Sequence, residues 1–120
     1  MRLNEVTPTD AEAIDGYGVG FFRVGGNLHH GSVLTSPTGT TAWGGLEDAE
    51  ALLALAGSID VLLVGMGREI APLPRALRAR LEAVGVGVEV MNSPAACRTY
   101  NVLLGEGRRI AAALLPIDTA

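Results

Sequence analysis

Short apolar runs separated by glycine-rich turns fill the first third of the chain. Phe21–Val24 and Leu28–Thr35 are rich in β-forming residues, and the Gly25-Gly26-Asn27 segment between them is typical of a hairpin turn. A second turn, at Pro37-Thr38-Gly39, precedes a third short strand at Thr40–Trp43. These segments predict an antiparallel meander.

Polar residues and alternating glycines come before this meander. Residues 1–13 predict a loose lead-in. Gly16, Gly18 and Gly20 then alternate with bulkier residues, which predicts a turn or a close approach of another backbone segment. No helical pattern follows these glycines, so they do not form a dinucleotide-binding fingerprint.

Strand-like and helical spacing alternate through the rest of the chain. Helical spacing predicts helices near 46–56, 73–84 and 94–106. Apolar runs predict strands at Ile59–Val64, Val86–Met91 and Arg109–Leu115, followed by a tail at 116–120. This order calls for right-handed crossovers and a parallel β-α-β-α-β unit.

Residues that favour helix ends support these boundaries. Gly57 and Gly85 stand where C-cap glycines belong, and Pro74 falls in the first turn of the second helix. Ser93 is the predicted N-cap of the third helix, with Pro94 as its first helical residue.

Composition limits the classes of function. The length of 120 residues suits a single domain over 1–120, and the net charge of −4 disfavours nucleic acid as a partner. The single cysteine, Cys97, makes no internal disulfide, which favours a reducing compartment. The sequence shows neither a signal peptide nor an apolar run long enough to span a bilayer. We therefore predict a cytoplasmic protein without membrane insertion.

Candidate chemistry gathers where two predicted parallel strands end. Gly65-Met66-Gly67-Arg68 follows one strand, and Ser93 begins a helix after its predicted neighbour. Ligands of open parallel sheets bind at this edge, where free helical N–H groups and a cation would accept an anion. The candidate binding residues are Gly65, Gly67, Arg68, Ser93, Ala96, Cys97, Thr99 and Asn101.

Each candidate also has a structural interpretation. Cys97 lies at the margin of a helix face on which Ala96, Tyr100 and Leu104 are predicted to be buried, so the thiol can be core. Thr99 and Asn101 can hydrogen-bond nearby loops, and the two glycines can form a tight turn. Arg98 is predicted to be exposed. No spacing of histidine and cysteine supports a metal site, and no motif implies a cofactor.

Several segments together resemble the family of the third assembly factor of mitochondrial respiratory complex I, with its bacterial and archaeal relatives. The matching segments are Gly65-Met66-Gly67, Val88-Glu89-Val90, Ala95–Asn101, Glu106-Gly107-Arg108 and Ala111–Pro116. The resemblance runs from about Ile14 to Pro116. It implies a three-layer α/β fold with a mixed central sheet, and protein partners. It assigns no catalytic residue.

Two main functional hypotheses follow. The first is a non-enzymatic protein-interaction or assembly factor, which the resemblance and the lack of a complete catalytic set favour. The second is a small anion-binding protein, or an enzyme, that uses a pocket between Gly65–Arg68 and the start of the 94–106 helix. A purely structural or oligomeric role needs only an exposed apolar patch. The substrate and the oligomeric state stay open.

Overall fold

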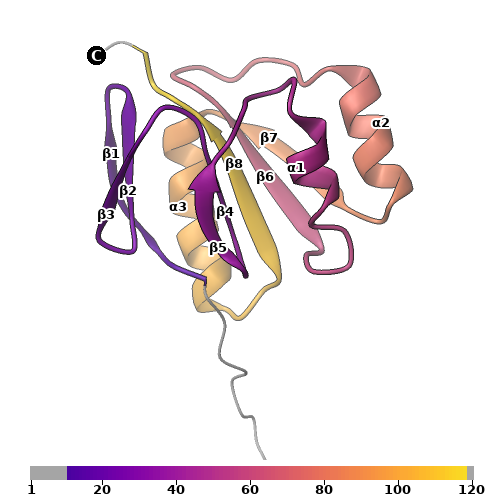
Figure 1. Cartoon of the computed structure of the whole chain (residues 1–120), viewed down its shortest axis with the longest axis horizontal. Helices are drawn as coiled ribbons and strands as arrows, with labels where there is room; N and C mark the ends of the chain where they lie inside the picture. The colour runs from indigo at the N-terminus through magenta and orange to yellow at the C-terminus, as the bar shows by residue number, and fades with distance from the viewer. Residues whose placement is uncertain (1–10, 119–120) are drawn as a thin grey trace, which may run out of the picture.

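The computed structural model describes residues 11–118, which form two separate sheets and three helices (Figure 1). The small sheet is antiparallel and contains β1 (Ile14–Gly18), β2 (Phe21–Val24) and β3 (Asn27–His30). The large sheet contains β4 (Val33–Ser36), β5 (Gly39–Ala42), β6 (Val61–Met66), β7 (Gly87–Met91) and β8 (Ile110–Leu115). The helices are α1 (Ala49–Leu53), α2 (Arg75–Ala83) and α3 (Ser93–Gly105).

The large sheet is mixed and has the order β5-β4-β8-β6-β7. β6 lies between β7 and β8 and is parallel to both, which confirms the predicted trio of parallel neighbours. β4 pairs antiparallel with both β5 and β8. The β6 and β8 runs are buried on both faces, which explains why they lack the alternating pattern of a half-exposed strand.

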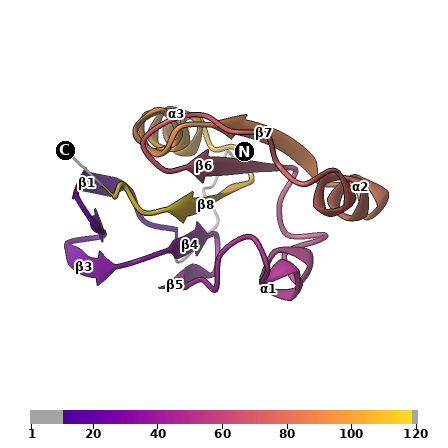
Figure 2. The ribbon, with the colours of Figure 1, turned by 90° about the horizontal axis from the view of Figure 1, so that it is seen from above.

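Two apolar cores lie on opposite faces of the large sheet. One contains Leu52 of α1 with Leu77 and Leu81 of α2. The other contains Tyr100 of α3 and Phe22 of the small sheet. Figure 2 shows the resulting layers, with α3 on one side of the sheet and α1 and α2 on the other. The predicted three-layer α/β class is confirmed.

The first third of the chain differs from the predicted single meander. The segment predicted as one strand, Leu28–Thr35, is divided between β3 and β4, which belong to different sheets. Gly31 adopts φ +83° between them, a conformation that bulkier residues disfavour, and so redirects the chain. The glycine-rich stretch is not simply a turn: it contains β1, where the Phe21 ring lies over Gly18 and leaves no room for a Cβ atom.

The helices are close to their predicted positions but differ at their ends. α1 is much shorter than predicted, because the chain tightens after Leu53 into turns such as Leu55 N–H to the Leu52 carbonyl (3.1 Å). Pro74 precedes α2 as its N-cap instead of lying within the first turn. None of the helices within residues 11–118 combines the length and apolar character needed to cross a membrane.

Both predicted ends of the domain contact the fold where they are described. Residues 1–10 and 119–120 of the predicted lead-in and tail lie outside the described residues. Within the lead-in, Glu12 accepts a hydrogen bond from the Thr40 hydroxyl (3.1 Å). Within the tail, Ile117 is buried, and its carbonyl accepts from the Gly20 N–H (2.7 Å). The segment from Pro116 to Ile117 therefore docks against the small sheet.

Candidate functional site

Ser93 links the ends of β6 and β8 at the carboxyl edge of the sheet. Its N–H donates to the Gly67 carbonyl (2.8 Å), and its hydroxyl donates to the Leu115 carbonyl (2.6 Å). The same hydroxyl accepts from the Gly67 N–H (2.9 Å), and Ser93 has no exposed surface. The prediction of Ser93 as N-cap is wrong: Asn92 caps α3 by accepting from the Ala95 N–H (2.8 Å).

Gly65 is required by the close approach of α3 to the sheet. A Cβ atom at this position would lie 2.8 Å from the Ser93 Cα and 2.9 Å from the Leu114 Cδ2. Gly67 adopts φ +92° as the chain turns away from β6. The two glycines and Ser93 therefore meet at one edge, as the sequence predicts. There, Gly65 packs against Ser93, and Gly67 forms hydrogen bonds with it.

The N–H groups proposed for an anion are engaged within the fold. The Gly67 N–H donates to Ser93, and the Ala96 N–H donates to the Asn92 carbonyl (3.0 Å). Cys97 lies behind them on the core face of α3, 3% exposed. Burial raises the pKa of the Cys97 thiol to about 12, although Arg98 partly opposes the shift. The thiol is therefore protonated and unreactive at neutral pH.

An open depression of about 500 Å³ remains on the solvent side of the Ser93 contacts. It is lined by Met66, Gly67, Arg68, Glu69, Leu115, Pro116 and Asp118. Arg68 pairs with Glu69 (3.6 Å), and both side chains are exposed. Because two carboxylates share this surface with one guanidinium, the depression carries no net positive charge and would bind a free anion only weakly.

The two remaining candidates lie farther along α3. Thr99 is half-buried, and Asn101, eight residues beyond Ser93, is roughly 12 Å along the helix axis. The Asn101 side chain accepts from the Ile14 N–H (2.8 Å) and donates to the Ile14 carbonyl (2.8 Å). It ties α3 to β1 and is separated from the depression, so it fits the structural interpretation.

The predicted helix face is mostly confirmed and contains an unsatisfied hydroxyl. Ala96 and Tyr100 are buried and Arg98 is exposed, whereas Leu104, near the end of α3, is only half-buried. The Tyr100 hydroxyl has no hydrogen-bond partner among the described residues. Burial, and to a smaller extent the Glu12 carboxylate, raises the pKa of the Tyr100 hydroxyl above its ordinary value, and Thr35 partly opposes this shift.

Sequence reasoning missed the polar row beside Tyr100. The Thr35 and Thr40 hydroxyls are 2.8 Å apart, and Thr40 donates to Glu12. The signal for this row is the pair of threonines at facing positions of a hairpin, since Thr35 and Thr40 are register partners. The row leads from the core to the half-buried Glu12 carboxylate and links the lead-in to the β4–β5 hairpin.

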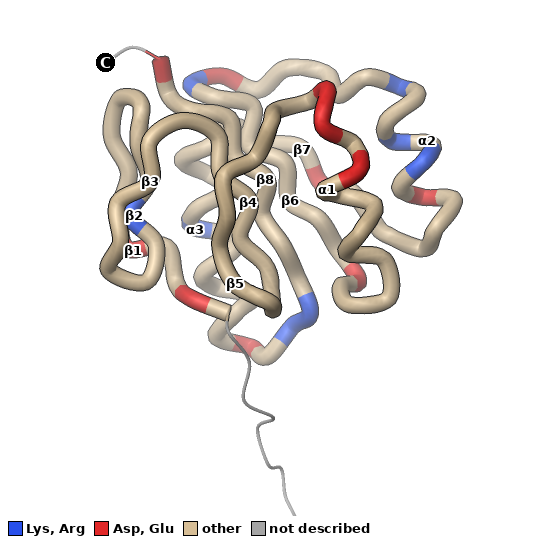
Figure 3. Tube along the Cα trace, viewed as in Figure 1, with Lys and Arg blue, Asp and Glu red and all other residues tan. Residues whose placement is uncertain are grey.

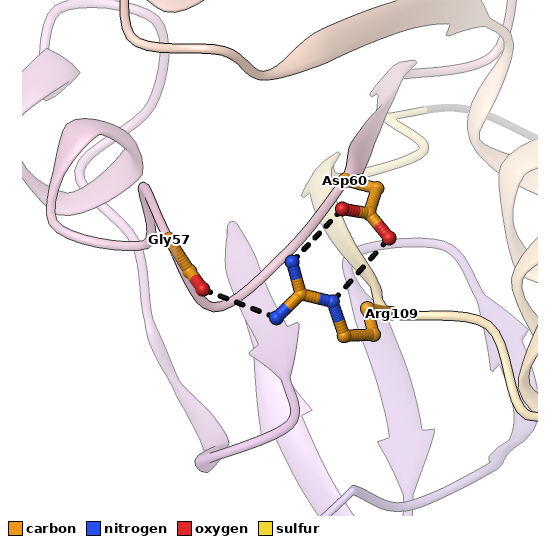
Figure 4. Close-up of polar contacts among 3 residues, drawn as sticks. All are labelled: Gly57, Asp60 and Arg109. Atoms are coloured by element: carbon orange, nitrogen blue, oxygen red, sulfur yellow. Dashed lines mark hydrogen bonds and ion pairs between the residues drawn. The ribbon is translucent and has the colours of Figure 1, made fainter.

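An ion pair joins the amino ends of β6 and β8, at the opposite end of these strands from Ser93. Arg109 contacts both carboxylate oxygens of Asp60, at 2.9 and 3.3 Å, and donates to the Gly57 carbonyl at 3.1 Å (Figure 4). The hydrogen bonds from Arg109 lower the pKa of Asp60. Both side chains are more than half exposed, so water and salt screen the ion pair and its contribution to folding stability is small.

Comparison with known proteins places the chain in a family. A sequence model described as "Protein of unknown function (DUF498/DUF598)" matches residues 14–115. An uncharacterized protein of Rhodobacter capsulatus is 53% identical over 107 residues, covering 89% of this chain and 86% of the relative. Human NADH dehydrogenase (ubiquinone) 1 alpha subcomplex assembly factor 3 is 32% identical over 123 residues, covering 97% of this chain and 67% of the relative. The zebrafish protein of the same name is 31% identical, and the chain spans 59% of its length.

Solved structures share the fold closely. A crystal structure described as an outer membrane protein from Bartonella henselae has 37% identity and a TM-score of 0.83, covering 92% of this chain and 99% of that one. A Mth938-like domain from Bordetella pertussis has 32% identity and a TM-score of 0.76, covering 99% of this chain and 94% of that one. The expected resemblance and the fold that it implies are confirmed.

Proposed function

Because the chain belongs to the family described as protein of unknown function (DUF498/DUF598), which it matches over residues 14–115, we propose that it is a protein-binding assembly factor for an NADH dehydrogenase. Several relatives carry that role in their names, and the chain spans about two thirds of the human one. We propose that it acts by binding and does not catalyse a reaction.

The observation that carries this proposal is the internal use of the candidate reactive groups. The Ser93 hydroxyl both donates and accepts within the fold and is fully buried. A serine nucleophile needs a free path to substrate and an adjacent base, and Ser93 has neither in the part of the chain that the structure describes. The buried Cys97 thiol with its raised pKa is equally unsuited to attack a substrate. The internal use of these groups supports a role in which the protein acts by binding a partner through its surface.

Deletion of the gene in its own host tests the proposal. We expect loss of assembled NADH dehydrogenase on native gels, accumulation of smaller subcomplexes, and recovery when the wild-type gene is restored. The Cys97→Ser variant should restore assembly as well as wild type, because no step uses the thiol. Normal assembly in the deletion strain would refute the role, and failure of a folded Cys97→Ser protein would point to chemistry at the thiol.

A second candidate function is weak binding of a small anion at the depression. Its support is Arg68, which is more than half exposed on this surface and could turn from Glu69 toward a ligand. Titration with inorganic phosphate, followed by amide chemical shifts, tests it. Shifts confined to residues 66–69 that vanish in Arg68→Ala would support the site, and unchanged spectra at millimolar phosphate would exclude it.

A further inference from the structure

The outer edge of β7 offers backbone groups to a further strand. Within residues 11–118, β7 pairs only with β6 and ends the large sheet. The Gly87 N–H points toward β6, since it donates to the Asp60 carbonyl (2.9 Å). Strand geometry alternates the direction of successive residues, so Val88 and Val90 direct their N–H and C=O groups outward. On this geometry the outward Val90 groups have no neighbouring strand to pair with among the described residues.

An apolar groove lies beside these outward groups. It has a volume of about 350 Å³ and is open to solvent. Its lining residues are Ile70, Ala71, Pro72, Leu73, Arg78 and Val90. Ile70 is 65% exposed, which is a large apolar exposure for a side chain next to an edge strand. A strand added to β7 would place alternate side chains over this groove.

Positive charge borders the groove. Arg78 reaches over the edge of β7 and donates to the Val88 carbonyl (3.2 Å), and its other contact is a looser ion pair with Glu82 (3.6 Å). Arg75 is exposed and has no ion-pair partner among the described residues. Figure 3 shows basic residues along α2 and acidic residues along α1. A carboxylate on an added strand would meet the Arg78 guanidinium here.

We propose that β7 is the docking edge for an extended, acidic segment of a protein partner, which adds a sixth strand to the large sheet. Main-chain hydrogen bonds to Val88 and Val90 would align the segment. One of its apolar side chains would enter the groove beside Ile70, and a carboxylate two residues away would pair with Arg78. This inference rests on the proposed protein-binding function and names its surface and the chemistry of its partner.

A second copy of the chain fits this edge less well. Antiparallel pairing of two β7 strands that uses both Val88 and Val90 centres on Glu89 and places the two Glu89 carboxylates directly opposite each other. Like charges in that position are destabilising. Glu89 is exposed and forms no ion pair among the described residues, so nothing offsets the repulsion.

Amide hydrogen exchange followed by NMR tests whether the edge is open. In the free protein, the Val88 and Val90 amides should exchange rapidly, while the Gly87 and Glu89 amides, directed at β6, should be protected. Protection of Val88 and Val90 that grows with protein concentration would overturn the proposal in favour of self-association. Concentration-independent protection of both would mean that the edge is already covered, and would also overturn it.

Random octapeptides displayed on phage test which kind of peptide binds the β7 edge. Selection on the wild-type protein should enrich peptides with an acidic and an apolar residue two positions apart. A synthetic copy of an enriched peptide should protect the Val88 and Val90 amides. Methylating the peptide nitrogens that face β7 should weaken binding by about tenfold or more, whereas methylating the alternate nitrogens should not. Failure to enrich such peptides, protection elsewhere, or equal effects of the two methylation patterns would overturn the proposal.

Charge variants supply the control. Arg78→Glu should weaken binding of the enriched peptide by about tenfold or more, because it places a carboxylate against the acidic residue. Arg108→Glu makes the same charge change at the other end of the strands and should leave binding unchanged. Equal effects of the two variants would overturn the assignment of Arg78.

The same pair of variants separates this inference from the proposed function. If Arg78→Glu still retains subunits of the NADH dehydrogenase in a pull-down, β7 is not the docking edge, although the assembly role stands. If the wild-type protein retains no NADH dehydrogenase subunits while the peptides still bind β7, the proposed assembly role is wrong, but the assignment of β7 as a docking edge is supported.

Discussion

The two ends of the parallel strands β6 and β8 are held together by opposite kinds of chemistry. At the amino end, Asp60 and Arg109 form a charged pair that is more than half exposed. At the carboxyl end, the neutral Ser93 is fully buried, and of its two hydroxyl contacts the one with the Gly67 N–H is buried and the one with the Leu115 carbonyl is partly buried. Water competes more strongly for the exposed hydrogen bonds of the charged pair than for those of Ser93. We therefore expect the neutral end to matter more for stability.

Gly65→Ala should have the largest effect on this comparison. The added methyl would overlap the backbone of α3 at Ser93 and the Leu114 side chain, and α3 can relieve the overlap only by moving off the sheet. We expect a loss of about 3 kcal/mol in the free energy of unfolding, measured with urea. Gly16→Ala is the control, because nothing lies within 4 Å of its added Cβ. Equal losses would show that the packing at Gly65 is loose.

Ser93→Ala should have the next largest effect. The substitution leaves the buried Gly67 N–H and the partly buried Leu115 carbonyl without their partner. We expect a loss of about 2 kcal/mol by the same urea measurement. Ser58→Ala removes an exposed hydroxyl and should change little. A loss below about 0.5 kcal/mol at Ser93 would mean that water replaces its hydroxyl.

The buried Cys97 thiol makes folding stability fall at high pH. The folded state holds the Cys97 proton to about pH 12, whereas the unfolded chain releases it near its usual pKa of 9.0. The unfolded state therefore binds fewer protons in this interval, and stability falls as pH rises from about 9 to 12. Unfolding midpoints between pH 8 and 10 should decline more steeply in wild type than in Cys97→Ala. Parallel declines would show that the thiol is accessible to solvent.

The sequence predicted the parallel trio well because β6 and β8 are buried on both faces and therefore appear as continuous apolar runs. It also placed Gly65, Gly67 and Ser93 at one edge, because carboxyl ends of parallel strands must meet there. Their roles could not be predicted locally. Ser-Pro is a common helix start, but Asn92 takes the N-cap position because the Ser93 hydroxyl is used by β8, which ends 22 residues later.

The errors in the first third have a related cause. Alternating glycines lower the intrinsic preference for a strand, so the sequence predicts a turn or a close backbone approach where the structure has β1. Its pairing with β2 and the Phe21 ring over Gly18 stabilise the strand through tertiary contacts. Likewise, the sequence predicts a single strand over Leu28–Thr35, and the positive φ of Gly31 within it marks where the chain leaves one sheet for the other.

The smallest expected effect belongs to Asp60→Asn at the exposed end. The carboxylate pKa is lowered by Arg109, so the ion pair stabilises the fold above the usual pKa of 3.8 and loses that contribution as pH falls through the lower, folded value. Exposed charges are also screened by salt. At pH 7, the difference in urea midpoint between wild type and Asp60→Asn should be smaller than that between wild type and Ser93→Ala. It should shrink in 1 M salt, where the Debye length falls to about 3 Å, and it should also shrink in acid. Glu106→Gln removes an exposed carboxylate that has no ion pair among the described residues and serves as control. An Asp60→Asn effect that persists in high salt and equals that of Ser93→Ala would reverse the comparison and make the charged end the stronger tie.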